Sequence, residues 1–430
     1  MKKLIVILLI GLVIRFLGFA LISQLPQNGD LLRYADWGRI AFLKGYDQTY
    51  NKKAITFGGD SNNQPPGSIY PISLAYSGHL KTVNVINKLY PTSIEKSDVI
   101  NLTVLYFFMR LPSFTAEIIL TILLFIYVRK NKGLHPHLAA SLLYLNPVLI
   151  YNSAFWGQMD AINNLFFIGA IMLLTSGKLV NSTIFLTLST MIKLSILPLL
   201  PLYIVQFFKH HPSPKVIITS GVAVIGTVLL LTLPVSKKPI EWLAEYLKLS
   251  SGGELQSITS EAFNFWYVLF SFPLFSNTVP DEAALFLGTA LSTYGYLLYI
   301  IFAVPLIIHV IRNRKNDPEK TFALLALLAL ISFIFLPKMH ERYLFPFFPL
   351  LAVALGFSKK WLWFFVSISI IHFLNLFISW DPGYVPYIPY AVLENDWFKW
   401  GLGVALIGVF LILYYEILPI KKSANQKFQK

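Results

Sequence analysis

One short basic run in the chain could bind an anion. His340-Glu341-Arg342 follows Pro337-Lys338 directly after a long apolar stretch. Arginine can hold a phosphate through two parallel hydrogen bonds, and lysine and histidine add positive charge. The alternative is that these bases only extend from the end of an apolar helix toward water. His-Glu-Arg is not a zinc motif, which needs two histidines one helical turn apart and a further ligand.

A second cluster combines an aromatic ring with an amide and a carboxylate. Trp156, Gln158 and Asp160 lie within five residues, between two apolar stretches. An aromatic surface beside hydrogen-bonding groups suits the binding of sugar hydroxyls. Alternatively, Trp156 anchors a helix at a membrane interface and Asp160 caps the next helix. The residues alone leave both interpretations open.

Asp30 is a third candidate, because it directly follows an Asn-Gly pair near the end of the first apolar stretch. Aspartate is also a favoured N-cap residue, so Asp30 could simply begin the helix expected over 31–43. Asp36 is interpreted as a solvated charge on a face of that helix, paired with Arg33 or Arg39.

Several charges interrupt the apolar stretches. Arg110 and Glu117 are seven residues apart, so they share one face of a helix. Ionisable groups inside a membrane helix suggest function, but a buried ion pair between them or with Arg15 is an equal alternative. Lys193 lies where a short helix should reach the surface and could bind a phosphate.

The composition is that of a polytopic membrane protein. Of 430 residues, 56% are hydrophobic and 13% are charged, and the mean hydropathy is +0.62. Soluble domains carry about 25% charged residues. We expect an all-α fold of about twelve membrane helices, near 4–22, 102–128, 137–152, 160–176, 179–191, 194–208, 216–234, 284–311, 321–336, 343–357, 361–379 and 401–418. Lys193, Pro198 and Pro201 break the stretch 179–208.

The distribution of charge predicts the orientation. Basic residues occupy short loops that become cytoplasmic when both chain ends are cytoplasmic, among them Arg129, Lys130, Lys209, Lys215 and Arg312. Most acidic residues then face the other side. The net charge of +14 therefore reflects topology, and no nucleic-acid partner is expected, because the basic residues form no continuous patch. The absence of cysteine excludes disulfides and thiol catalysis.

Two extramembrane segments, 23–101 and 235–283, are too long to be simple connectors. The first should carry the helix at 31–43 and an interfacial helix at 68–90. In the second, Asn264 and Trp266 could line a substrate cavity, although packing at the interface is the alternative for Trp266. The expected organisation is a first membrane module over 1–234, the second outer loop over 235–283, and C-terminal membrane helices over 284–430.

The order of these motifs resembles the GT-C superfamily of integral-membrane glycosyltransferases. The motifs are an early acid in the first outer loop, a Pro-Pro turn, Phe108-Met109-Arg110, a Leu-Asn-Pro element, Trp156 to Asp160, Glu261 to Trp266, and His340-Glu341-Arg342. The nearest branches are bacterial relatives of the second GPI mannosyltransferase and glucosyltransferases that use a dolichyl-phosphate sugar. Where other members often have Tyr-Pro-Pro, this chain has Gln64-Pro65-Pro66.

The resemblance implies transfer of a hexose, with mannose favoured, from a polyprenyl-phosphate donor to an acceptor hydroxyl, with inversion. The acceptor would be a glycolipid, a polysaccharide or a protein. Asp30 would be the general base, and the basic run would hold the leaving phosphate. No metal or other cofactor is expected. The site would be extracytoplasmic, in a bacterial plasma membrane rather than an ER membrane.

Two other classes compete with this hypothesis. A transporter or lipid-linked-sugar flippase would suit the broken segment 179–208, but transporters usually contain internal repeats, and none is visible here. An assembly subunit without catalytic activity is also compatible with the sequence.

Overall fold

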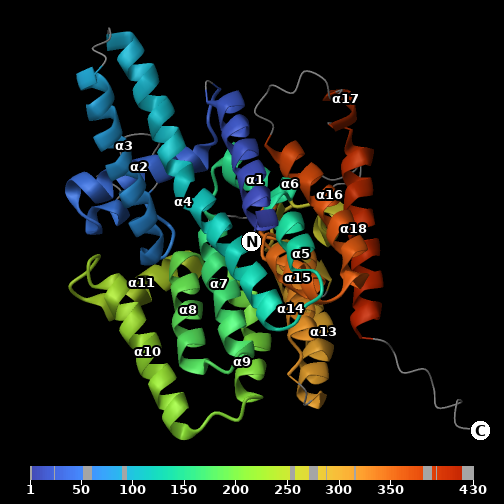
Figure 1. Ribbon diagram of the computed structural model, residues 1–430. Coiled ribbons are helices and arrows are strands. Elements are labelled where there is room, and N and C mark those ends of the chain that lie inside the picture. The colour runs from blue at the N-terminus through green and yellow to red at the C-terminus, as the bar shows by residue number, and fades with distance from the viewer. Residues whose placement is uncertain are drawn as a thin grey trace, which may run out of the picture.

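The chain folds into a helical bundle, shown in Figure 1. The computed structural model describes residues 2–23, 25–51, 61–89, 94–251, 257–270, 279–286, 288–313, 316–380, 390–393 and 395–418. Its α-helices are α1 (Lys2–Ile22), α2 (Gly29–Lys44), α3 (Ile69–Leu89), α4 (Ile94–Lys130), α5 (Pro136–Tyr144), α6 (Pro147–Ile150), α7 (Asp160–Thr175), α8 (Leu179–Ile192), α9 (Leu200–Phe208), α10 (Pro214–Thr232), α11 (Pro239–Ser251), α12 (Phe265–Phe270), α13 (Leu291–Arg312), α14 (Pro318–Phe335), α15 (Phe347–Phe357), α16 (Leu362–Ser379), α17 (Tyr390–Leu393) and α18 (Asp396–Ile417).

Among the described residues, eight helical segments are long and apolar enough to cross a membrane. They are Lys2–Ile22, Asn101–Lys130, Pro136–Trp156, Pro214–Thr232, Leu291–Arg312, Pro318–Phe335, Lys359–Ser379 and Asp396–Ile417. The prediction of a helical, polytopic membrane protein is therefore confirmed. The other four predicted spans are shorter apolar helical segments of 10–17 residues, so the total of twelve stays a prediction.

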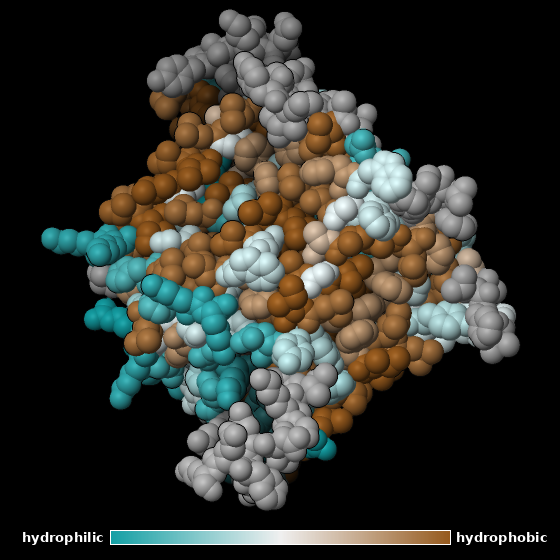
Figure 2. Space-filling model, turned by 90° about the vertical axis from the view of Figure 1, so that its right-hand side faces the viewer, coloured by the Kyte–Doolittle hydropathy of each residue, from teal (hydrophilic) through white to brown (hydrophobic). Residues whose placement is uncertain are grey.

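The outer helices expose large apolar side chains, as expected for a surface that contacts lipid. In the most apolar stretch of α1, only 28% of the residues are buried. The corresponding fractions for α10 and α13 are 17% and 22%. Figure 2 shows hydrophobic residues over most of one face, with hydrophilic residues gathered to one side of it. An exposed apolar surface of this extent would aggregate in water, which supports membrane insertion.

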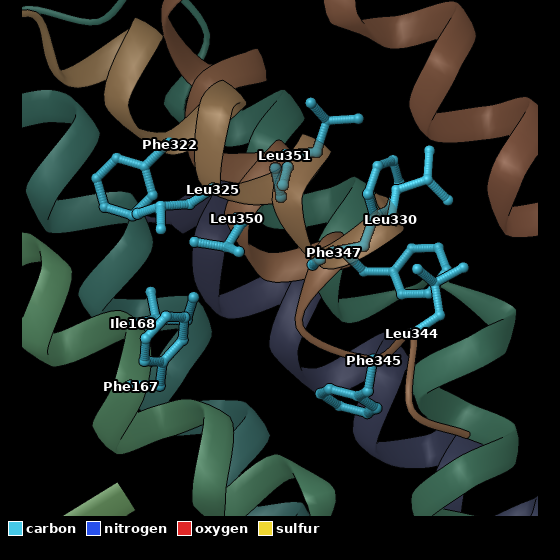
Figure 3. Close-up of a cluster of buried hydrophobic side chains, with 14 of the residues drawn as sticks. Phe167, Ile168, Phe322, Leu325, Leu330, Leu344, Phe345, Phe347, Leu350 and Leu351 are labelled. Carbon is cyan, nitrogen blue, oxygen red and sulfur yellow. The ribbon is translucent and has the colours of Figure 1, made fainter. Parts of the chain in front are cut away.

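The core lies around α14, in which every residue from Thr321 to Phe335 is buried. α14 packs against α15, α13, α18 and α7. Figure 3 shows how side chains of α14 and α15 meet those of α7 in one apolar cluster. The labelled members are Phe167, Ile168, Phe322, Leu325, Leu330, Leu344, Phe345, Phe347, Leu350 and Leu351.

The two helices predicted in the first outer segment are present as α2 and α3. α2 contacts α3, and α3 in turn contacts α4. Gly38 permits the close approach of α2 to α3, because a Cβ atom there would lie 2.7 Å from the carbonyl oxygen of Ile72. α3 is not among the eight long apolar segments, and its interfacial position stays a prediction.

Two short strand pairs modify the all-α expectation. β1 (Thr259–Ser260) pairs in parallel with β4 (Met339–His340), and β2 (Ala284–Phe286) pairs antiparallel with β3 (Thr289–Ala290). An isolated bridge continues the first pair between Glu261 and His340. These backbone bonds attach the second outer segment directly to the basic run at 338–342.

The predicted break in 179–208 is present. α8 ends at Ile192, Lys193 adopts an extended conformation, and a 3-10 helix over Leu194–Leu199 precedes α9. Pro198 lies inside the 3-10 helix, where the lack of an amide hydrogen is compatible with irregular hydrogen bonding. Because of this break, the Lys193 side chain turns away from the axis of α8.

A buried ion pair between the first two long helices should dominate local stability. Arg15 Nε lies 2.6 Å from Glu117 Oε2, and both side chains are fully buried. The sequence allowed an ion pair of Glu117 with either Arg110 or Arg15, and the structure has the pair with Arg15. Because removal of either partner leaves an unpaired buried charge, Arg15→Met or Glu117→Gln should lower the free energy of unfolding by about 3–5 kcal/mol.

Unfolding by denaturant in detergent micelles checks this prediction. The double variant Arg15→Met/Glu117→Gln should recover part of the loss, because no lone charge remains. Lys238→Gln is the control, since it breaks the exposed Lys238–Glu241 pair and should have little effect. Single variants as stable as the unmodified chain would contradict the prediction.

Candidate functional site

The Asp30 carboxylate is the centre of a polar cluster built from distant parts of the chain. Gln158 Nε2 donates a hydrogen bond of 2.6 Å to Asp30 Oδ2. Arg342 Nη2 lies 3.3 Å from the same oxygen. The other oxygen, Oδ1, has Arg33 Nη1 at 3.6 Å. The Asp30 side chain is 21% exposed, so the carboxylate is held by protein groups and still accessible.

Asp30 does not cap α2, and that interpretation was wrong. The N-cap is Asn28, whose side chain accepts a 2.8 Å hydrogen bond from the backbone N–H of Asp30. The helix begins at Gly29, two residues earlier than predicted. Asn28 thus performs the capping role and leaves the Asp30 carboxylate available for other partners.

A chain of hydrogen bonds fixes the Gln158 side chain. Gln64 Nε2 donates to the Tyr34 hydroxyl at 3.2 Å, and this hydroxyl donates to Gln158 Oε1 at 3.0 Å. With its oxygen occupied, the Gln158 amide must present its nitrogen to Asp30. The Ser113 hydroxyl also holds the Gln158 backbone carbonyl at 2.6 Å.

Sequence reasoning missed Tyr34 and Gln64 as members of this cluster. Tyr34 lies one helical turn after Asp30, on the same face of α2. Gln64 immediately precedes Pro65-Pro66, and its place in an expected turn gave no sign of a role in the cluster.

Arg342 is held on its other side by Glu341. The Arg342 Nη1 atom lies 2.8 Å from Glu341 Oε1, and His340 Nδ1 lies 3.6 Å from Glu341 Oε2. The guanidinium carbon is 6.0 Å from the ring centre of Trp156 and 5.8 Å from that of Tyr343. Arg342 is therefore positioned by two carboxylates and two aromatic rings.

The electrostatics favour ionised carboxylates. Burial raises the pKa of Asp30, but Arg342, the Gln158 hydrogen bond, Lys193 and Arg33 outweigh it, so this pKa lies below its ordinary value. Burial also opposes ionisation of Glu341, yet His340 and Arg342 lower its pKa to about 2. The two carboxylates in turn raise the pKa of Arg342. At neutral pH the Asp30 carboxylate can therefore accept a proton.

A second ion pair lies beside the first. Lys193 Nζ contacts Asp160 Oδ1, and Asn152 Nδ2 donates to Asp160 Oδ2 at 3.3 Å. Lys193 also lies 5.5 Å from the ring centre of Tyr343, which contacts Arg342 as well. Lys193 and Arg342 thus share one aromatic neighbour, and the structure brings the predicted residues Asp160 and Lys193 together near Asp30.

Trp156 belongs to the same region. Its ring stacks on Trp380 at 5.7 Å between ring centres, and its Nε1–H is buried without a hydrogen-bond partner among the described residues. Buried donors without a partner are uncommon and call for an explanation. A bound substrate oxygen would supply one. Trp380 had not been predicted.

Lys338 does not join the cluster as predicted. Its ammonium lies 3.2 Å from Asp281 Oδ2, in the second outer segment, and its backbone is in the left-handed region with φ of 59°. The chain reverses at Lys338, so the Lys338 side chain points in a different direction from those of His340 and Arg342. The expected clamp of three bases is therefore reduced, and Arg342 is its member in contact with Asp30.

Asn264 and Trp266 are structural. Asn264 is fully buried, and its Oδ1 accepts from the backbone N–H groups of Trp266 and Tyr267, which caps α12. The Trp266 indole donates to the Phe335 carbonyl at 2.8 Å. The hydrogen bonds of Asn264 go to backbone groups, which include the Phe333 carbonyl, so its role in substrate binding stays a prediction.

Arg110 binds backbone carbonyls next to the site. It donates to the carbonyls of Ala154 at 2.8 Å and Phe155 at 2.9 Å, just before the turn that carries Gln158. It therefore positions that turn, and its predicted role in substrate binding stays a prediction. Asp36 was also misjudged, because it pairs with Arg39 at 2.8 Å as expected but is buried, not solvated.

In the part of the chain that the structure describes, no three histidine or acidic side chains gather as a metal site. The cluster instead joins an ionised carboxylate with guanidinium, ammonium and indole donors. Such a set can remove a proton from a hydroxyl and bind an anion beside it. No protein-family model and no curated protein matches this chain.

The cluster geometry predicts which cation controls Asp30. Arg342→Gln should raise the pKa of Asp30, because a buried carboxylate loses its strongest compensating charge. Infrared titration of the carboxylate band, with Asp30→Asn as the subtraction reference, measures this shift. Arg33→Gln is the matched control and should have a smaller effect, since Arg33 is 41% exposed and farther away. A larger shift in the Arg33 variant would contradict the assignment.

Proposed function

We propose that this protein is an integral-membrane glycosyltransferase of the GT-C type. It transfers a hexose, with mannose favoured, from a polyprenyl-phosphate donor to a hydroxyl of a glycolipid, polysaccharide or protein. The observation that carries the proposal is the contact of the accessible Asp30 carboxylate with Gln158 and Arg342. Sugar transfer from a phosphate needs a base that accepts the proton of the acceptor hydroxyl and a cation that stabilises the leaving phosphate. This cluster contains both.

In the proposed reaction, Asp30 accepts the proton of the acceptor hydroxyl. The acceptor oxygen attacks the anomeric carbon, and the bond from this carbon to the phosphate oxygen breaks. The electron pair leaves with the polyprenyl phosphate, and the configuration inverts. Because Asp30 Oδ2 is occupied by Gln158 and Arg342, the oxygen proposed to take the proton is Oδ1.

Arg342 is proposed to stabilise the leaving phosphate. Two of its nitrogen atoms are occupied by Asp30 and Glu341, whereas its buried Nε has no hydrogen-bond partner within the described part of the chain. A phosphate oxygen could accept from this donor. Lys193 is close enough to Asp30 to lower its pKa and adds positive charge on the same side.

The location proposed for the reaction is the extracytoplasmic face of a bacterial plasma membrane. The proposed side is supported by the positive-inside arrangement of short loops, which puts the segment carrying Asp30 opposite the cytoplasm. Polyprenyl donors reside in the bilayer, so a site near helix ends can receive them laterally.

Asp30→Asn should reduce turnover by about 10²–10⁴, because the variant loses the general base but keeps a hydrogen-bond acceptor for Gln158. The assay uses protein in lipid nanodiscs, a panel of polyprenyl-phosphate sugars and mixed acceptor glycolipids, and measures release of polyprenyl phosphate.

Asp47→Asn is the control for this assay, since Asp47 is an exposed acid of the same outer segment. Turnover above about a tenth in Asp30→Asn would refute the base assignment. If the unmodified chain releases no phosphate from any donor, the transferase proposal fails and a transporter becomes the better hypothesis.

Arg342→Ala should weaken donor binding and slow departure of the phosphate together. We expect a higher KM for the donor and a lower kcat, with little change in the KM for the acceptor. Titration of the donor at saturating acceptor measures this. A variant with unchanged donor dependence would remove Arg342 from the phosphate role.

A further inference from the structure

A separate cavity, lined in part by the segment that pairs with His340, is not used by the mechanism above. Its volume is about 280 Å³, at the small end of ligand pockets. Hydroxyl side chains, one carboxylate, one ammonium and two aromatic rings line it, with Ser260, Glu261, Phe263, Tyr267, Ser379 and Lys399 among them. These residues come from the segment around β1, from α12, and from α16 and α18.

Glu261 is held in an unusual backbone conformation at the wall of this cavity. Its backbone is left-handed, with φ of 54°, which is unfavourable for a residue with a side chain. The Asn375 side chain holds the Glu261 carbonyl at 2.7 Å and accepts from the N–H of Phe263 at 3.0 Å. Asn375 is itself buried. Such enforced conformations concentrate at functional positions.

The cavity is connected to the Asp30 cluster through one backbone bridge. Glu261 pairs with His340, and the next residue, Glu341, binds Arg342. Burial raises the pKa of Glu261, and the nearby Glu341 raises it further against the opposing effect of Lys399. The backbone bridge to His340 and the Glu341–Arg342 pair therefore link the cavity lining to the Asp30 cluster.

The chemistry of the lining differs from that of the cationic cluster. The lining has one carboxylate, Glu261, and one ammonium, Lys399, which also pairs with Asp396, and its remaining polar groups are hydroxyls that both donate and accept. Phosphate would favour the arginine and lysine side. Neutral, hydroxyl-rich groups fit this lining, and aromatic rings can contact the apolar face of a sugar.

We propose that this cavity binds a carbohydrate unit of the acceptor and holds it beside Asp30 and Arg342. The proposal rests on the glycosyltransferase function proposed above and adds the place and class of the acceptor. Its volume suits a unit about the size of one sugar ring, not a complete lipid-linked glycan.

Acceptor kinetics test the proposal. Lys399→Gln and Ser260→Ala should each raise the KM for the acceptor, by about tenfold for Lys399→Gln, because a hydrogen bond to a charged group is lost. The KM for the donor should not change. Lys238→Gln is the matched control, since Lys238 also pairs with an acid three positions away and directly precedes α11, outside the cavity lining.

Two kinetic outcomes would overturn the proposal while leaving the enzyme in place. The first is an acceptor KM that stays unchanged in both cavity variants. The second is a rise in the donor KM alone, which would assign the cavity to the donor.

A binding measurement separates this proposal from the proposed function. Saturation-transfer NMR with methyl α-mannoside on the Asp30→Asn variant in detergent reports sugar contact without turnover. Signals that disappear when Lys399→Gln is added would support the cavity even if no donor were ever turned over. Signals that persist unchanged, or no signals at all, would overturn it.

Discussion

Keeping a carboxylate ionised in a largely buried position is the constraint on which the site depends. Burial alone would neutralise Asp30, so opposite charge and a hydrogen-bond donor must be brought to it. These come from Arg342 and Gln158, in segments far from Asp30 in the chain. Each partner is itself held, Gln158 by Tyr34 and Arg342 by Glu341. The relative placement of α2, the turn before α7 and the segment after α14 follows from this requirement.

Other buried charges are also paired with opposite charges. The exposed fraction of each pair indicates its role. Arg15 and Glu117 pair with no exposed surface, so they can stabilise helix packing but cannot meet a substrate. Asp30 retains 21% exposure and Arg342 retains 14%. An ion pair that is largely satisfied but still accessible is suited to chemistry, because a ligand can displace or share its bonds.

Hydropathy made the helical, membrane-spanning character predictable, whereas the site depended on local backbone geometry. Long apolar segments must be helical in a membrane, so their positions could be predicted closely. The direction of single side chains could not, because Lys338 turns toward Asp281 through a left-handed backbone and Asn264 is consumed by capping α12. The Asp30 carboxylate is accessible, and its capping alternative failed because Asn28, two residues earlier, took that role.

The packing of the interior bears on the choice between transfer and transport. A transport path needs polar groups or water along the middle of the bundle. Here α14 is buried along its length by apolar side chains from α7 and α15, and Figure 3 shows this contact. The break after α8 places Lys193 against Asp160, next to the Asp30 cluster, and does not open this core. The broken segment, the strongest sequence argument for a transporter, thus supplies a cation to the proposed transferase site.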